Sequence, residues 1–202
     1  ACPSALSYSP TLSFSLAPSW PPPFLSPPPS LHMVMAASAS LLSSSLSHAY
    51  ILEGADGSGR HTLALNSAAA LACEAKNDAN APLPCGVCPA CKKILERKSP
   101  DVIFVGSDGK ATLGVDAARF IKEDVYTVPN DLDDKIYIIE DADKMTPQAQ
   151  NSLLITLEEP PRNVVNILLC EQADKLLTTI RSRVQYVAMS RFTTEEINDY
   201  LV

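Results

Sequence analysis

Short apolar runs alternate with amphipathic stretches along residues 49–201, and the two kinds of segment follow each other regularly. The apolar runs predict buried strands at 49–53, 101–105, 135–140, 164–170 and 184–189. Helical spacing of apolar residues predicts helices at 61–75, 92–98, 115–125, 147–159 and 193–201. Strands and helices that alternate in this way predict an α/β fold, with a mostly parallel sheet and helices on both of its faces.

The first 40 residues do not follow this pattern. No Asp, Glu, Lys or Arg occurs from Ala1 to Leu52, and two triple-proline runs stand at 21–23 and 27–29. Proline fixes φ and removes a hydrogen-bond donor, so residues up to Ser30 are expected to be extended, polyproline-like or disordered. We therefore interpret residues 1–40 as a Pro/Ser-rich tail outside any domain.

Charge and hydropathy narrow the class of partner. The net charge of −7 falls on residues 53–202, which disfavours extensive direct binding of nucleic-acid phosphates by this region and favours protein partners. No run of 18 apolar residues predicts a membrane span, and no basic segment precedes an apolar run as in a secretory signal. These patterns predict a cytoplasmic protein with no membrane partner.

A glycine-rich segment lies between the first predicted strand and the first predicted helix. The residues of interest are Gly54, Gly57, Ser58, Gly59, Arg60, His61 and Thr62. Glycines in this context let backbone N–H groups face phosphate at a helix N-terminus, which favours a phosphate loop over a plain glycine turn. However, Arg60 stands where a lysine is usual, and His61 stands where Ser or Thr usually binds Mg²⁺. Binding of ATP or ADP with Mg²⁺ therefore stays open, and hydrolysis is expected to suffer most.

Four cysteines form a C-x₁₁-C-x₂-C-x₂-C array at Cys73, Cys85, Cys88 and Cys91. Thiolates at this spacing can enclose one tetrahedral Zn²⁺, and four protein ligands leave no open position, so the site would be structural. A disulfide pair, an iron–sulfur cluster and plain buried thiols are the alternatives; zinc is favoured over them, since disulfides are rare in a cytosolic-type α/β protein. Cys170, which ends a strand, is expected to be a core thiol.

Two further patterns have both a chemical and a plain interpretation. Glu140 and Asp141 lie at the C-terminal end of the predicted strand 135–140, where carboxylates could hold Mg²⁺ or orient water; the alternative is a solvated acidic turn that caps the next helix. Arg183 lies in a predicted turn before a strand. It is either a surface charge or an arginine that stabilises a phosphate in trans, and its spacing does not decide between them.

Several of these segments together resemble the AAA+ clamp-loader family of bacterial DNA polymerase III, over about residues 41–202. The segments that carry the resemblance are Ser47-His-Ala-Tyr50, the glycine loop, the cysteine array, the acid-ended strand, the run from Gln150 to Pro161 with its Leu-Glu-Glu-Pro-Pro end, and Thr179-Ile-Arg-Ser-Arg183.

The resemblance implies a domain plan and a set of sites. Residues 41–190 would form a nucleotide-binding-type domain with a zinc insertion at 73–91, and residues 191–202 would begin a truncated lid domain. It implies structural zinc on the four cysteines, a nucleotide cradle at 54–62, an acidic motif at Glu140 and Asp141, and an Arg183 that reaches a neighbouring subunit's ATP. The implied partners are other clamp-loader subunits and, through the complex, the sliding clamp and primed DNA.

Two kinds of subunit in that family fit the sequence differently. The gamma/tau kind is a working ATPase, whereas the delta-prime kind is a stator that supplies the trans-acting arginine. Arg60, His61 and the Glu-Asp order at 140–141 favour the stator, with weak or absent ATPase activity. An ATP-hydrolysing motor is the alternative, and a zinc-stabilised interaction domain without a nucleotide role is a third possibility from another class.

Overall fold

The computed structural model describes residues 47–78, 81–107 and 112–190. The predicted tail at 1–40, the start of a lid at 191–202 and the helix at 193–201 lie outside these residues. Among the helices of the described segments, none has the length and apolar character needed to cross a bilayer.

Five parallel strands form one sheet in the order β2-β3-β4-β1-β5. Apolar, β-branched-rich runs make these strands, as expected for a sheet buried on both faces. The strands are β1 (Ala49–Glu53), β2 (Val102–Val105), β3 (Lys135–Ile139), β4 (Val164–Cys170) and β5 (Gln185–Ala188). All five predicted strands and their parallel arrangement are confirmed.

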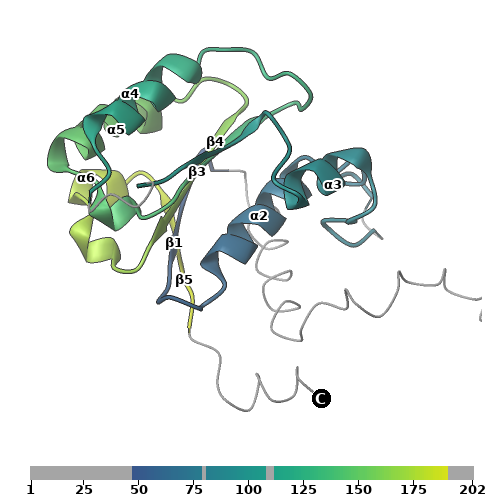
Figure 1. Ribbon diagram of the computed structural model, residues 1–202, viewed down its shortest axis with the longest axis horizontal. Helices are drawn as coiled ribbons and strands as arrows, with labels where there is room; N and C mark the ends of the chain where they lie inside the picture. The colour runs from purple at the N-terminus through teal and green to yellow at the C-terminus, as the bar shows by residue number, and fades with distance from the viewer. Residues whose placement is uncertain (1–46, 79–80, 108–111, 191–202) are drawn as a thin grey trace, which may run out of the picture.

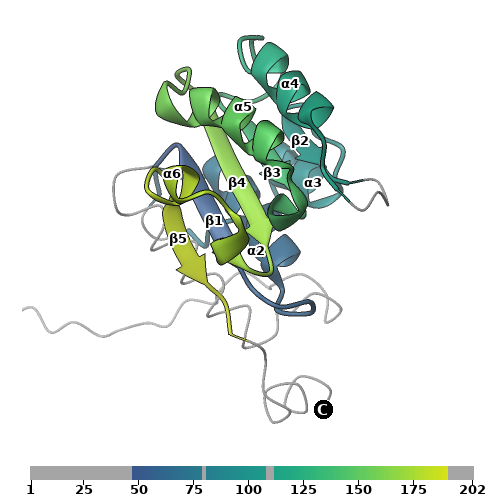
Figure 2. The same cartoon turned by 90° about the vertical axis from the view of Figure 1, so that its left-hand side faces the viewer.

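Helices cover both faces of the sheet, as Figures 1 and 2 show. One face packs on α4 (Val115–Asp124), α5 (Pro147–Glu158) and α6 (Thr178–Arg181), and the other on α2 (Arg60–Leu71) and α3 (Pro89–Leu95). Two 3₁₀ turns, Ala142–Lys144 and Ala173–Lys175, follow β3 and β4. The sheet therefore lies between two apolar clusters, and its strand ends remain available for a site.

Two helix predictions need correction, and one helix was missed. The helix expected at 61–75 ends at Leu71, because the chain turns there and brings Cys73 to the cysteine array. The helix expected at 92–98 instead spans Pro89–Leu95, since the Cys88 sulfur caps its N-terminus and proline suits the first helical position. The short helix α6 was not predicted, because four residues are too few for an apolar period to be detected.

The acidic turn after β3 does not cap α5, so the capping part of the plain interpretation of Glu140 and Asp141 is wrong. Thr146 caps α5 instead: its Oγ1 accepts a hydrogen bond of 3.2 Å from the backbone N–H of Ala149. Pro147 occupies the first turn, and α5 stops before Pro160. The two acids are therefore not needed to start α5.

A buried aspartate fixes the loop between α4 and β3. Asp101 is fully buried, and its carboxylate accepts hydrogen bonds from the backbone N–H groups of Asn130, Asp131 and Leu132 at 2.7, 2.6 and 2.9 Å. Burial acts to raise the pKa of Asp101, but these amide donors outweigh it and hold the pKa below its ordinary value. The charged form of Asp101 therefore stabilises the folded chain.

We expect Asp101→Asn to lower the free energy of unfolding at pH 7 by about 2 to 3 kcal/mol, because charged hydrogen bonds to the loop are lost. Because the pKa of Asp101 is lower in the folded chain than in the unfolded chain, its ionised carboxylate stabilises the fold at pH values above the ordinary Asp pKa. This stabilisation disappears as the pH falls through the folded pKa. Urea unfolding at pH 7 and at successively lower pH should show that the difference in unfolding free energy between wild type and Asp101→Asn narrows below about pH 4. Asp133→Asn, in the same loop with a side chain 83% exposed, should stay within about 0.5 kcal/mol of wild type.

Candidate nucleotide cradle and cysteine cluster

The glycine loop joins the end of β1 to the start of α2, as the sequence predicts. Gly54 donates its backbone N–H to the carbonyl of Cys170 at 3.0 Å, and a Cβ on Gly54 would lie 2.3 Å from Ser58 Oγ. Gly57 and Gly59 have φ values of 80° and 82°, in the left-handed region that favours glycine. The backbone of a phosphate loop is therefore present.

The N-terminus of α2 has no side-chain cap. Gly59 is its N-cap and has no side chain to cap it, and within the described chain no acidic residue stands in the first turn of α2. The first N–H groups of a helix have no intrahelical partners, and phosphate is a ligand that suits them. On its backbone alone, the loop fits a nucleotide phosphate; Thr62 lies exposed on this first turn.

The Arg60 side chain folds back onto the loop. It is only 5% exposed, and its guanidinium donates to the Gly54 carbonyl and to Asp56 Oδ1, the latter at 2.8 Å. A second carboxylate, that of Glu171, lies 3.7 Å away. The one side-chain cation expected to face phosphate is thus paired with two carboxylates of its own chain and bound to a carbonyl. The side chains therefore fit a nucleotide less well than the backbone does.

The two acids after β3 have different surroundings. Glu140 Oε1 lies 3.8 Å from His61 Nε2, so the structure brings this acid to the loop. Asp141 has a left-handed backbone, with φ 54°, and its carboxylate accepts a hydrogen bond from Ser107 and pairs with Lys144, both at 3.1 Å. Of the acidic pair, only Glu140 contacts a residue of the cradle.

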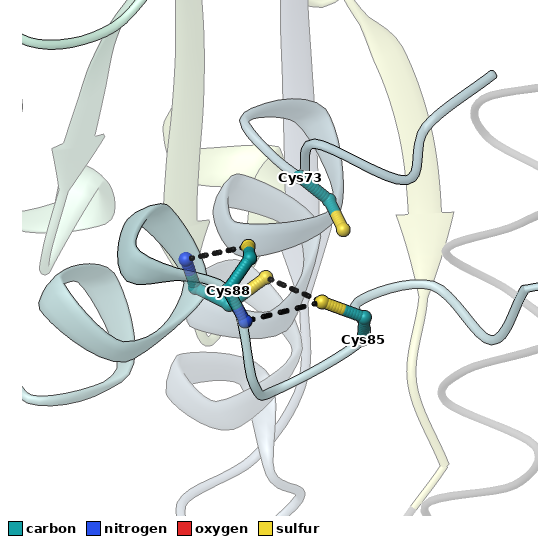
Figure 3. Close-up of side chains that lie close together, drawn as sticks. Cys73, Cys85 and Cys88 are labelled. Atoms are coloured by element: carbon teal, nitrogen blue, oxygen red, sulfur yellow. Dashed lines mark hydrogen bonds between the residues drawn. The ribbon is translucent and has the colours of Figure 1, made fainter.

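The four cysteines of the array converge on one point. Their sulfur atoms all lie within 4.8 Å of one another, and those of Cys85 and Cys91 are 3.9 Å apart. A tetrahedral Zn²⁺ with Zn–S bonds of about 2.3 Å places sulfurs about 3.8 Å apart. Figure 3 shows Cys73 at the end of α2 facing Cys85 and Cys88, which come from the loop before α3. This donor set fits a metal ion.

The environment of the thiols also suits a cation. Burial raises the pKa values of Cys73 and Cys91, which opposes thiolate formation unless a positive charge compensates it. Burial acts in the same direction on Cys85, but the amides of Cys88 and Val87 outweigh it and lower the pKa of Cys85 to about 7. All four residues are free cysteines in the structure, as is the buried core thiol Cys170.

Arg183 lies far from the cradle of its own chain. Its guanidinium donates to the Thr179 carbonyl and pairs with Glu158 Oε1, at 2.8 and 2.9 Å, and its side chain is 39% exposed. It precedes the first residue of β5, whereas the glycine loop follows the last residue of β1, and the two strands are parallel neighbours. The arginine and the cradle are therefore at opposite ends of these strands.

Two residues of the site were missed from the sequence. Arg97 places Nη1 3.8 Å from the same Glu140 oxygen that faces His61. Glu53, the last residue of β1, accepts a hydrogen bond of 2.8 Å from the Ala173 N–H. No sequence pattern pointed to Arg97, which is a single arginine after a basic helix. The only pattern that pointed to Glu53 was its place at the end of a buried strand.

A sheet of this order with a glycine loop after β1 defines an AAA+ domain of the P-loop type. The family model described as DNA polymerase III, delta subunit, matches residues 32–193. The chain belongs to the DNA polymerase III clamp-loader subunit family.

Known relatives support the same assignment. The chain is 36% identical to DNA polymerase III subunit tau of Bacillus subtilis over 168 residues, covering 82% of this chain and 29% of that protein. It is also 36% identical to subunit delta' of the same organism over 159 residues, covering 78% and 46%. A gamma subunit-related protein of Thermotoga maritima has the same fold, with a TM-score of 0.58 and 24% identity over 82% of this chain and 48% of that one. The chain thus spans less than half the length of these relatives.

Proposed function

We propose that this chain acts as a stator of the delta-prime kind in a DNA polymerase III clamp loader, and that it presents Arg183 to ATP held by a neighbouring subunit. The observation that carries the proposal is the position of Arg183 at the opposite end of the sheet from its own glycine loop. An arginine there cannot serve the cradle of its own chain, but it can act in trans as arginine fingers do.

The state of the cradle favours a stator over a motor. Arg60 is neutralised by Asp56 and Glu171, and His61 replaces an oxygen ligand for Mg²⁺. Residues 54–62, with Glu140 nearby, would bind ATP or ADP with Mg²⁺. This binding would be weak, or it would lead to little hydrolysis. Asp141, bound to Ser107 and Lys144, would have to leave these partners to take part.

The proposed role extends to the domain plan and the partners. Residues 41–190 form the AAA+ domain with structural Zn²⁺ on the cysteine insertion at 73–91, and residues 191–202 begin a lid. The partners are other clamp-loader subunits and, through the complex, the sliding clamp and primed DNA during replication in the cytoplasm. A motor of the gamma/tau kind is the second candidate, favoured by the intact glycine loop and the open end of α2.

Nucleotide titration of the zinc-loaded chain tests the cradle directly. We expect wild-type chain to show no ATP turnover, and to bind ADP with Mg²⁺ at least about tenfold more weakly than Arg60→Lys, because a compact ammonium frees the loop that the guanidinium now fills. Calorimetry and a phosphate-release assay measure both quantities.

Other results would favour the other candidates. Clear hydrolysis by the wild-type chain, abolished by Arg60→Ala, would replace the stator with a motor. Absence of nucleotide binding in both wild type and Arg60→Lys, together with no effect of the chain on a neighbour's ATPase, would leave a zinc-stabilised interaction domain.

A further inference from the structure

The turn after α3 contains an arginine where the backbone favours glycine. Arg97 has φ 55°; its N–H donates to the Ile94 carbonyl at 2.8 Å, and the N–H of Lys98 donates to the Lys93 carbonyl at 2.7 Å. This pair of bonds is a Schellman motif, and Arg97 holds the left-handed position that glycine usually fills. A side chain at this position strains the turn, so a gain elsewhere should accompany it.

The Arg97 side chain reaches the acid of the candidate nucleotide site. Its guanidinium carbon lies 4.5 Å from the centroid of the Phe104 ring on β2, and Nη1 lies 3.8 Å from Glu140 Oε1. The ring contact is a cation–π interaction, which holds the guanidinium over the strand beside β3.

The Glu140 carboxylate is partly covered by neighbouring groups, and its side chain is 26% exposed. The oxygen that faces Arg97 also lies 3.8 Å from His61 Nε2, while the other oxygen packs so closely on Gly106 that a Cβ there would be 3.2 Å away. One Glu140 oxygen thus lies near the side-chain nitrogens of His61 and Arg97, and the other lies against the backbone of Gly106. A further ligand that approached the first oxygen would therefore meet Arg97 and His61 beside it.

We propose that Arg97 is a positioning residue that acts as a resident cation of this site: it holds Glu140 and competes with a divalent cation for its carboxylate. Mg²⁺ requires oxygen ligands in near-octahedral geometry and keeps several waters. A guanidinium 3.8 Å from the same oxygen opposes Mg²⁺ by its charge and by its volume. The proposal rests on the proposed function only in assigning Glu140 to the nucleotide site. It gives a physical reason why this cradle would use Mg²⁺ poorly, separate from Arg60.

The cysteine cluster and this cation belong to one small unit. Cys91 lies within α3, and Arg97 lies in the turn that ends α3, so a metal on the four sulfurs would anchor the helix that carries the arginine. The cysteine cluster is thereby linked to Glu140 through α3 and the side chain of Arg97.

Mn²⁺ binding to the full zinc-loaded chain tests the proposal, with paramagnetic broadening of assigned amides near Glu140 as the readout. Removing the cation in Arg97→Gly or Arg97→Ala should tighten Mn²⁺ binding about two- to fivefold, the range expected for one partly exposed charge pair. Arg97→Lys keeps the charge and should resemble wild type. Arg97→Gly should melt at or above the wild-type temperature, because glycine suits the left-handed backbone, whereas Arg97→Ala keeps the strain of a side chain there. The two variants thus differ in stability, so a gain in Mn²⁺ binding that both share cannot be a stability effect.

Adding Glu140→Gln to Arg97→Gly should abolish the gain. Equal Mn²⁺ affinity in wild type, Arg97→Gly and Arg97→Ala, including no binding by any of them, would overturn the proposal, as would a gain that survives Glu140→Gln. Failure of every variant to bind ADP would instead remove the nucleotide role from this chain, and it would leave the Mn²⁺ comparison unaffected.

Discussion

Replacing Arg183 with alanine is expected to slow ATP hydrolysis by about a thousandfold at the neighbouring site that the proposed stator role assigns to it, since trans-acting arginines contribute at least this much to phosphoryl transfer. Turnover by the whole complex should fall by less, because sites served by other subunits continue. The measurement is steady-state ATP hydrolysis by the reconstituted complex, with primed DNA and clamp present.

The geometry explains why this loss should appear only in the assembled complex. Arg183 contacts the end of α5 through Glu158 and the first turn of α6 through the Thr179 carbonyl, both at the end of the sheet away from the glycine loop. Its side chain is 39% exposed, so a neighbour's phosphate can compete with the Glu158 carboxylate for it. The isolated chain should bind ADP equally well with and without the substitution.

Two matched variants separate a catalytic arginine from a structural one. Glu158→Gln removes the ion-pair partner but keeps Arg183, so turnover should be unchanged or higher. Arg181→Ala removes an exposed arginine two residues away that pairs with Asp174, and it should have no effect. If Glu158→Gln and Arg183→Ala reduced turnover equally, the pair would be structural and the trans role would be wrong.

The centre of the sheet was predictable from the sequence because its middle strands, β3 and β4, are largely apolar runs. Val164–Cys170 is buried at every position, and so is Lys135–Ile139, where even the lysine is covered. Such runs have no polar face, and a strand without a polar face is typical of a sheet covered on both sides. Helix ends were less predictable, since the end of α2 and the start of α3 are set by where the cysteines must meet.

The site was predictable to the extent that spacing defines it. Glycine positions and the cysteine array specify backbone turns, and both turns are where the sequence places them. The directions of long side chains were not predictable: Arg60 turns inward to Asp56, and Arg97 crosses to Glu140 from a segment 43 positions earlier in the chain. These contacts depend on tertiary packing, which no local pattern records.

Loss of one thiolate from the cysteine cluster should have the largest effect on stability. We expect Cys91→Ser to lose the metal and to lower the free energy of unfolding by about 3 to 5 kcal/mol, because binding of structural zinc is coupled to folding. Cys91 is fully buried in the apolar cluster between α2, α3 and the sheet, so a bare hydroxyl there also loses packing. Elemental analysis and thermal unfolding with and without a chelator provide the two readouts.

Cys170→Ser is the matched control, since Cys170 is equally buried but belongs to the other apolar cluster. It should cost about 1 to 3 kcal/mol through burial of a hydroxyl, retain one zinc per chain and remain sensitive to chelator. Cys91→Ser should be insensitive to chelator, because it has no metal left to lose. If wild-type chain purified under reducing conditions without chelator contained no zinc, and chelator left its melting temperature unchanged, the four sulfurs would be ordinary thiols, and α3 would keep its place without a metal.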